Sequence, residues 1–331
     1  MAITHFISHH FHLNEQAEPS VHLRETELAV DDLTETLAMD LKRAYLSRVN
    51  RQHGQFSGEA ETAGLAGWLD GLLQEKSDFL AFSGQVANQL LALLKEQEVE
   101  LRGHLVLFLE QQFDQQALYL FVVNQRIATR INEQQAVEPV LTLDLGASLM
   151  AIKVDLTQWK GEGGAYLSMT ASRAGKGGAT LLEQLTGFSE GIDKAAVTRD
   201  FLERIELFSQ NLPEEQVNDY RSQVVSYCME QDLQDEPVEI GGLSQAVEGV
   251  DPSVFSSYLA DNLPSGNSKL LLDRKSLQRY VKFAGREKDL AISFSSYQLN
   301  KRIHYQADSD TLSITGLPKT LRSQLLGHVE E

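Results

Sequence analysis

The chain has 331 residues, of which 29 are Lys or Arg and 47 are Asp or Glu, so its formal net charge is −18. A hydrophobic share of 42% is typical of folded proteins and excludes wholesale disorder and fibrous repeats. Because this much negative charge repels phosphate, it also excludes a protein that coats nucleic acid or an anionic membrane with its whole surface.

Neither the apolar runs nor the N-terminus indicates a membrane segment or an export signal. The longest uninterrupted apolar run, residues 117–123, is far shorter than the roughly 18 residues that span a bilayer. The N-terminus lacks the basic start and long apolar centre of a secretory signal. Cys228 is the single cysteine, which excludes an internal disulfide and agrees with a reducing compartment. We therefore expect a cytoplasmic protein.

The first third of the chain mixes strands and helices. Residues 3–13 and 21–30 look extended and are joined by a polar stretch, so they predict an opening hairpin. Asp32, followed by Glu35 three residues later, marks the start of a helix whose apolar residues keep helical spacing. A second helix is predicted to begin at Ser77 or Asp78.

A Gly-rich stretch at residues 54–71 weakens the prediction of any regular element there. From Gly103 to about Thr170 short segments rich in branched and aromatic residues follow one another closely. This spacing leaves no room for crossover helices, so we expect an antiparallel meander.

The second half begins as a helical region. Helices are predicted at residues 180–186, 194–208, 214–232 and 251–262. Residues 263–268 contain Pro and Gly and predict a linker. Beyond it the residue pattern favours strands at 277–285, 289–296, 301–306 and 311–316, with a turn at 307–310 and a short final helix at 319–326.

These patterns predict an α+β fold. Residues 1–171 should form a domain with an antiparallel sheet and flanking helices. Residues 172–331 should form a helical region followed, from about residue 266, by a small basic antiparallel β subdomain. No internal repeat or low-complexity segment stands out.

Histidines near the N-terminus are the first candidates for chemistry. They are His5, His9, His10, His12 and His22. His10 and His12 should share one face of a strand, but the sequence offers no cysteine partner and no third ligand at a spacing typical of metal sites. We expect ordinary strand histidines, with no metal and no cofactor.

Residues 172–180, SRAGKGGAT, resemble a phosphate-binding loop before a helix, with Arg173 and Lys176 close by. The nucleotide-binding P-loop pattern fails here, because Thr170 stands where its first glycine belongs and Gly177 replaces the Ser or Thr after the lysine. Two interpretations of this segment stay open: a basic loop that contacts phosphate, and a plain connecting loop.

No residue pattern indicates an enzyme. Cys228 lies in line with the apolar face of a predicted helix, so a buried position is expected rather than the exposed electropositive setting of a reactive thiol. Asp144 and Asp155 follow predicted strands without a spacing that indicates acid and base catalysis, and turn carboxylates are the expectation.

The most informative feature is the local charge of residues 269–304. This segment has nine basic residues and three acidic ones, a net +6, while the rest of the chain has 20 basic and 44 acidic residues, a net −24. Aromatic residues alternate with the basic ones, a composition that could bind a phosphate backbone. The alternative is that the aromatic residues form a core and the basic ones are merely solvated or paired with the acidic remainder.

The chain also resembles bacterial nucleoid-associated proteins of the YejK (NdpA) family. The resemblance runs from about residue 3 to residue 327 and rests on the order of segments at 77–83, 153–159, 223–231, 281–285 and 311–325. It implies a non-enzymatic protein found with the bacterial nucleoid and in contact with DNA, without a set of DNA-contacting residues to carry over.

Together these observations predict a cytoplasmic, nucleoid-associated protein that binds double-stranded DNA through phosphate contacts with weak sequence specificity. The candidate contact residues are Arg173, Lys176, Arg274, Lys275, Arg279, Lys282, Arg286, Lys288, Lys301 and Arg302. The alternative is an acidic adaptor that reaches the nucleoid through protein partners and barely touches DNA. No membrane partner is expected, and a homodimer stays open.

Overall fold

The structure is a computed structural model that describes residues 2–57, 64–146, 150–161, 164–171, 177–263, 269–295, 298–299 and 302–329. Within these ranges the side chains of residues 190, 214, 284, 295, 328 and 329 are left out. The chain divides into two compact units, Met1–Asp193 and Lys194–Glu331. Helices and antiparallel strands are mixed along the chain, so the predicted α+β class is confirmed.

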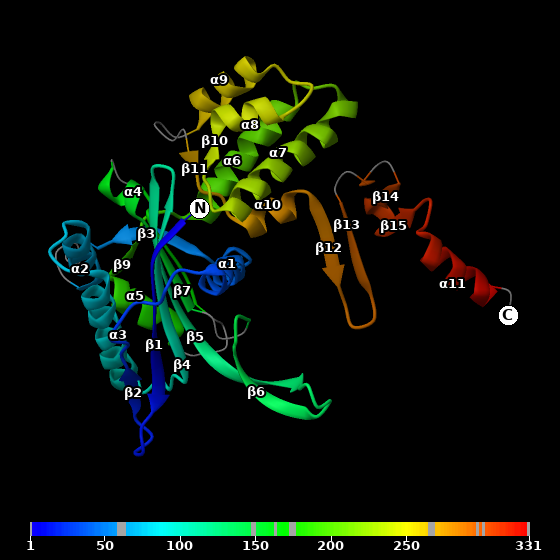
Figure 1. Ribbon diagram of the computed structural model, residues 1–331. Helices are drawn as coiled ribbons and strands as arrows, with labels where there is room; N and C mark the ends of the chain where they lie inside the picture. Colours follow the sequence, from blue (N-terminus) through cyan, green and yellow to red (C-terminus); the bar gives the residue numbers. More distant parts are fainter. Residues whose placement is uncertain are drawn as a thin grey trace. The chain divides into compact units, whose positions relative to one another are not determined.

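The first unit is built on one nine-stranded antiparallel sheet (Figure 1). Its strands follow the order β2-β1-β4-β5-β7-β8-β3-β9, and β6 pairs with β5 alone. Their bounds are β1 Ala2–Leu13, β2 Pro19–His22, β3 Gln52–Phe56, β4 Gly103–Gln112, β5 Gln115–Ile131, β6 Val137–Leu143, β7 Met150–Asp155, β8 Leu167–Thr170 and β9 Phe188–Glu190.

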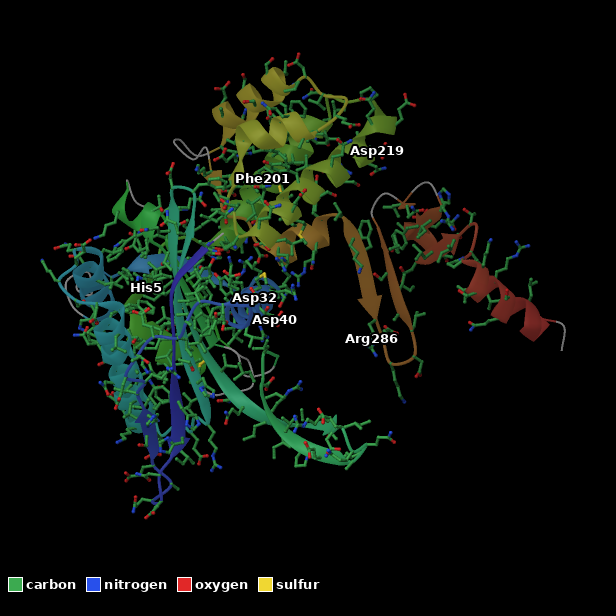
Figure 2. All side chains as sticks on the ribbon, viewed as in Figure 1. His5, Asp32, Asp40, Phe201, Asp219 and Arg286 are labelled. Atoms are coloured by element: carbon green, nitrogen blue, oxygen red, sulfur yellow. The ribbon has the colours of Figure 1, made fainter. Side chains whose placement is uncertain are left out.

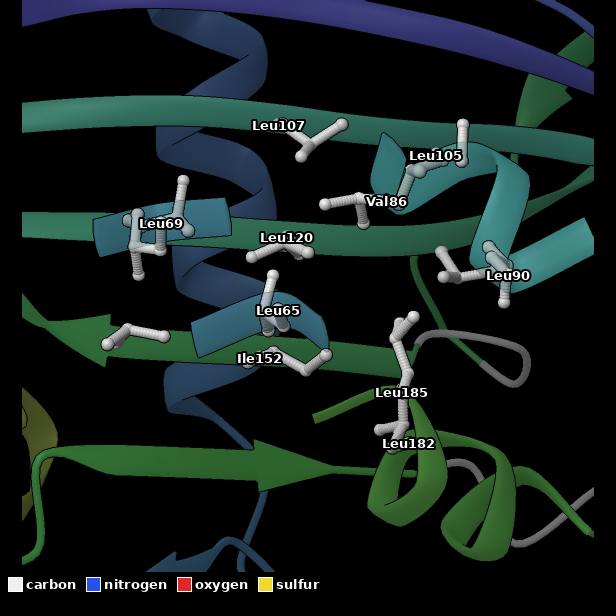
Figure 3. Packing of buried hydrophobic residues seen from close by; sticks show 14 of the residues in the cluster. Leu65, Leu69, Val86, Leu90, Leu105, Leu107, Leu120, Ile152, Leu182 and Leu185 are labelled. Carbon is white, nitrogen blue, oxygen red and sulfur yellow. The ribbon is translucent and has the colours of Figure 1, made fainter. Parts of the chain in front are cut away.

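Helices cover both faces of this sheet because successive strand residues point to opposite sides and both sides are apolar. On one face, β4 and β5 pack with the helices α2 (Gly64–Leu73), α3 (Phe79–Glu96) and α5 (Gly178–Thr186). Figure 3 shows leucines of these helices meeting Leu107, Leu120 and Ile152 of the sheet. The short helix α4 (Leu156–Lys160) also contributes Leu156 to this core.

The opposite face packs against α1 (Asp32–Leu46), whose Ala38, Leu41 and Tyr45 are buried. The helix begins at Asp32, as expected, and the residue that caps it is Asp31. The carboxylate of Asp31 accepts hydrogen bonds from the backbone N–H groups of Leu33 and Thr34, and Thr34 completes a capping box in place of Glu35.

Several predictions for this unit are confirmed. The opening hairpin forms between β1 and β2, although its second strand ends at His22 instead of continuing to residue 30, and α3 begins directly after Asp78, which caps it. The antiparallel meander was only partly right, because the short segments at 117–124 and 126–131 are not separate strands but parts of the 17-residue β5. The Gly-rich stretch, which weakened the prediction of any regular element, contains part of β3 and most of α2.

The second unit starts with a helical body formed by α6 (Lys194–Ser209), α7 (Glu214–Gln234), α8 (Ile240–Ala246), α9 (Pro252–Asn262) and α10 (Arg274–Tyr280). The short strands β10 (Val238–Glu239) and β11 (Lys269–Leu270) pair antiparallel within it. Its core includes Phe201, Leu243, Phe255 and Leu277, all without exposed surface. Cys228 is also fully buried there, as predicted.

Two hairpins and a helix follow this body. β12 (Lys282–Arg286) pairs with β13 (Ala291–Ser295), and β14 (Ile303–Gln306) pairs with β15 (Thr311–Ile314) around a 3-10 turn (Ala307–Ser309). The final helix is α11 (Lys319–Val329). The predicted linker lies mostly outside the described residues. In the part of the chain that the structure describes, no helix has both the length and the apolar character needed to cross a membrane.

Candidate nucleic-acid interface

Helix α10 brings the first candidate residues together. Asp273 caps the helix by accepting a hydrogen bond from the Ser276 backbone N–H at 2.8 Å. Leu277 is fully buried in the core of the second unit, whereas Lys275 and Arg279, four residues apart and therefore on neighbouring turns, are exposed. The helix thus presents two cations beside one another.

This helix corrects the strand predicted at residues 277–285. The chain stays helical to Tyr280, and only the part from Lys282 onward is a strand. Branched and aromatic residues at 280–283 favoured an extended reading. The cap at Asp273 and the packing of Leu277 against the helical body outweigh that preference.

Arg274 lies on the buried side of the same helix and is not part of an exposed surface. It is only 7% exposed, and its Nε donates a hydrogen bond to Oδ2 of Asp232 at 2.5 Å. The Nζ atom of Lys194 lies 3.9 Å from the other carboxylate oxygen of Asp232. Arg274 therefore holds α10 to α7 and is not part of the candidate surface.

Tyr280 anchors the end of α10 in a similar way. Its hydroxyl donates a hydrogen bond to Oε2 of Glu206 on α6 at 2.7 Å, and Arg221 donates to the other carboxylate oxygen. Burial, together with the Glu206 carboxylate, raises the pKa of the Tyr280 phenol above its usual value. This aromatic residue supports the helix instead of offering its ring to a ligand.

The β12–β13 hairpin carries its charges on one face. Lys282 and Arg286 are two strand repeats apart and so point to the same side. Their cross-strand neighbours on that face include Ala291 and Ser293, which are small and exposed. The two cations are therefore not screened by bulky neighbours, and Arg286 lies near the turn of the hairpin (Figure 2).

The other face of the hairpin is aromatic. Phe283 and Phe294 lie directly opposite one another, with ring centroids 5.4 Å apart. This pair stabilises the hairpin from the side away from the cations. The sequence indicated aromatic residues between the basic ones, but the small residues of β13 were missed, although the alternation Ala-Ile-Ser-Phe-Ser at 291–295 was a signal for them.

Lys288 lies in the turn of this hairpin between Glu287 and Asp289, and the Glu287 backbone N–H donates a hydrogen bond to the Leu290 carbonyl at 2.7 Å.

We define the basic strip as the exposed residues Lys275, Arg279, Lys282, Arg286 and Lys288. Residues 275–295 contain these five cations and two acidic residues, so the segment keeps a net charge of +3.

The remaining candidates are not part of this strip. Arg302 is exposed, and its guanidinium donates hydrogen bonds to the carbonyls of Thr315, at 3.3 Å, and of Gly316. It therefore connects the start of β14 to the end of β15. Arg173, Lys176 and Lys301 lie outside the described residues.

The N-terminal histidines are part of the sheet. His9 is fully buried, its Nε2 lies 3.0 Å from the hydroxyl of Ser83, and its Nδ1 accepts a hydrogen bond from the Arg24 backbone N–H. Burial and the nearby charge of Arg24 lower the pKa of His9 to about 4. His10 and His12 do share a face, with ring centroids 5.6 Å apart. Among the described residues, no group of His, Cys, Asp or Glu is arranged to hold a metal ion.

The other candidates for chemistry serve the fold. Burial raises the pKa of the Cys228 thiol to about 12, so the reactive thiolate is rare at neutral pH. Asp155 caps α4 by accepting a hydrogen bond from the Gln158 backbone N–H at 2.8 Å. Asp144 accepts one from the Gly146 N–H at 3.1 Å. Both are turn carboxylates, as predicted.

Comparison with known proteins shows which family the chain is similar to. A family model described as nucleoid-associated protein YejK matches residues 7–322. A nucleoid-associated protein of Pseudomonas putida is 31% identical over 330 residues, which cover 98% of each chain. A nucleoid-associated protein of Pseudomonas aeruginosa is 29% identical over 330 residues, which cover 98% of this chain and 97% of that protein.

Proposed function

Because the chain belongs to the family of YejK nucleoid-associated proteins, we propose that it is a non-enzymatic protein of the bacterial nucleoid that binds double-stranded DNA through the basic strip. The observation that carries this proposal is the hairpin face on which Lys282 and Arg286 stand above small residues. This arrangement lets a phosphate approach both cations without displacing a bulky side chain.

The spacing of the strip suits the DNA backbone. Four residues of strand place Lys282 and Arg286 roughly 13 Å apart along β12, a distance close to the ~12 Å width of the major groove. Lys282 could then contact a phosphate on one side of that groove and Arg286 a phosphate on the other side. Contacts of this kind fix position without reading bases, so sequence specificity should be weak.

The acidic remainder of the chain limits the number of contacts but does not forbid them. Exposed charges farther apart than about 8 Å are largely screened at physiological ionic strength. The strip should therefore act locally, while the acidic surface keeps DNA from wrapping around the whole protein. One face of the protein would meet DNA.

Salt dependence tests this proposal directly. If about four or five phosphates are neutralised, the logarithm of the affinity for a labelled duplex should fall against the logarithm of salt concentration with a slope of about −4. The double variant Lys282→Glu/Arg286→Glu should flatten that slope to about −2 and weaken binding at least roughly tenfold. A matched double reversal of exposed cations in the first unit, Arg43→Glu/Lys95→Glu, should leave both values unchanged.

A slope near zero for the unaltered protein, or equal losses in the two double variants, would contradict DNA binding by the strip. The second candidate function is then favoured by the net charge of −24 outside residues 269–304. In that case the acidic surface would attract basic nucleoid proteins. Partners retained by the immobilised protein after nuclease treatment would support the adaptor, and their loss would oppose it.

A further inference from the structure

Four histidines lie together on one face of the first unit's sheet, at its β2 edge. His10 of β1 lies directly opposite His22 of β2 and, on its other side, directly opposite His104 of β4. His12 follows two residues later on β1, so it points to the same side. The ring centroids are 5.0 Å apart for His10 and His104 and 5.6 Å apart for His10 and His12. We name these four residues the histidine face.

His10 is at the centre of the histidine face and has another histidine on three sides. Cross-strand neighbours are close enough for like charges to destabilise a sheet. Burial, together with His12 and His22, lowers the pKa of His10, and burial together with His10 lowers the pKa of His104. The charged groups that act on these two rings are histidines, and no carboxylate of the described residues compensates a proton there. The closed sheet therefore favours neutral rings.

The hydrogen bonds of His104 also require a neutral ring. The side-chain amide N–H of Gln125 donates to Nε2 of His104, with 3.0 Å between the two nitrogen atoms. Nδ1 then carries the ring proton and donates it to the hydroxyl of Ser8 at 3.2 Å. A second proton, on Nε2, would replace the hydrogen bond from Gln125 by a contact between two donors. Protonation of His104 therefore removes a link between β4 and β5.

The charged residues around the histidine face do not offset its protonation. Arg24 follows β2 and Arg102 precedes β4, so the neighbouring segments add cations. The carboxylates on these elements are Glu15 and Glu18, both exposed in the turn between β1 and β2, and Asp144 after β6. None of these carboxylates acts on the pKa of the central ring. Protons added to the histidine face therefore repel one another.

Two further histidines of β1 act on the segment that follows β2. His9 points to the opposite side of the sheet, and its Nδ1 accepts a hydrogen bond from the Arg24 backbone N–H at 3.2 Å, which it can do only while unprotonated. A ring nitrogen of His5 lies 2.9 Å from the carboxylate of Glu27, so a proton on this ring would attract that carboxylate. Acid therefore loosens residues 19–24 and leaves Glu27 held against β1.

We propose that acid opens this edge of the sheet: protonation of the histidine face releases β2 and the two residues after it, while the other strands of the first unit stay paired. β2 is an edge strand of four residues beside β1, so it can leave without breaking another pairing (Figure 1). Val21 and Leu23 then leave the core against which they pack, and residues 10–13 of β1 become an open strand edge. The proposal concerns the first unit and stands whether or not the basic strip binds DNA.

The direction of the pH effect follows from proton binding in the two forms. The ordinary pKa of a histidine is about 6.5, and His10 and His104, whose pKa values are lowered in the closed sheet, bind protons more tightly in the open form. The closed edge therefore has its full stability above about pH 6.5 and loses it as the pH falls. We expect the release between about pH 6 and about pH 5.

Hydrogen–deuterium exchange of the full chain, followed by mass spectrometry, tests this release. From about pH 7 to about pH 5, after correction for the intrinsic pH dependence of exchange, the protection of amides in residues 19–24 should fall at least about tenfold. Strand β7, in the interior of the same sheet, should stay protected over the same exchange times at both pH values. This difference distinguishes local release of the edge from unfolding of the whole unit.

Two substitutions at one position then separate charge from packing. His10→Lys puts a permanent cation between His22 and His104 and should release β2 already at about pH 7, whereas the uncharged His10→Gln should limit the loss at about pH 5 to less than about threefold. His304→Gln, at an exposed position in the second unit, should behave like the unaltered chain. Constant protection of β2 across this pH range, simultaneous loss in β2 and β7, or equal exchange in the Lys and Gln variants would overturn the proposal.

Discussion

The strands of the nine-stranded unit and of the β12–β13 hairpin both alternate their side chains between two faces, but the unit buries both faces whereas the hairpin exposes one. In β4 and the inner half of β5 both sides of the sheet are covered by helices, and Leu107 and Phe121 have no exposed surface. In the hairpin Phe283 stays 47% exposed, while its polar side carries the cations. The comparison teaches that alternation builds a core where helices cover the strands and builds a functional surface where they do not.

The largest expected effect separates the two regions by stability. Phe82 of α3 is fully buried in the first unit, so Phe82→Ala should lower the free energy of unfolding by about 3 to 5 kcal/mol. Phe283→Ala should cost less than about 1 kcal/mol, because much of that ring is already in water. Urea unfolding followed by circular dichroism measures both. Similar losses would show that the hairpin depends on burial as the sheet does.

Two neighbouring cations sharpen the same comparison. Arg274→Gln leaves the carboxylate of Asp232, whose side chain is only 11% exposed, without its main partner, so a loss of about 2 to 4 kcal/mol in unfolding free energy is expected. Lys275→Gln should change stability by less than about 0.5 kcal/mol, yet reduce the salt slope of DNA binding by about 1. Stability and DNA titrations on both variants check this. A stable Arg274→Gln protein would remove Arg274 from the core.

Acid should weaken the nine-stranded unit more than the hairpins. His9 has its pKa lowered from 6.5 to about 4 in the fold, so the unfolded chain binds the proton first as pH falls. Stability is therefore full above about pH 6.5 and is lost between 6.5 and 4, by on the order of 2 to 3 kcal/mol. The urea midpoint should fall as pH is lowered through that range, and it should fall less steeply in the variant His9→Gln.

The smallest effect concerns two helix caps. Asp31 caps α1 in the first unit and Asp273 caps α10 under the basic strip. Replacing either by Ala should lower the free energy of unfolding by about 1 kcal/mol. Only Asp273→Ala should also weaken DNA binding, because frayed α10 no longer positions Lys275. Equal DNA affinity in the two variants would mean that the strip does not need an ordered helix.

Local signals in the sequence were sufficient where one residue decides the structure. Asp78 before an apolar helical pattern placed the start of α3, and the Ala-Asp turn residues placed the bend between β14 and β15. The signals failed where long-range packing decides. Gly54 looked like a loop residue, but β3 needs glycine there because a Cβ atom would lie 2.2 Å from the Ser189 carbonyl oxygen.

The candidate site shows the same limit. Counting charges identified the cationic segment from its sequence alone. A count cannot show that Arg274 is buried whereas Lys275 is exposed. Their different environments arise because Asp232, 42 residues earlier, lies against one side of α10. Likewise, the residues of β5 predict a strand at both ends, and nothing in them indicates that its outer half loses β4 and β7 as neighbours.

The continuity of β5 has a mechanical consequence. The 17-residue strand β5 runs without an intervening loop from the buried core into residues 125–143, the arm in which β5 pairs only with β6. The strand is about 57 Å long. A load applied at the tip therefore passes along covalent bonds directly into the centre of the sheet. The arm should therefore bend little where it leaves the sheet, so that a molecule bound to the arm fixes the orientation of the entire first unit.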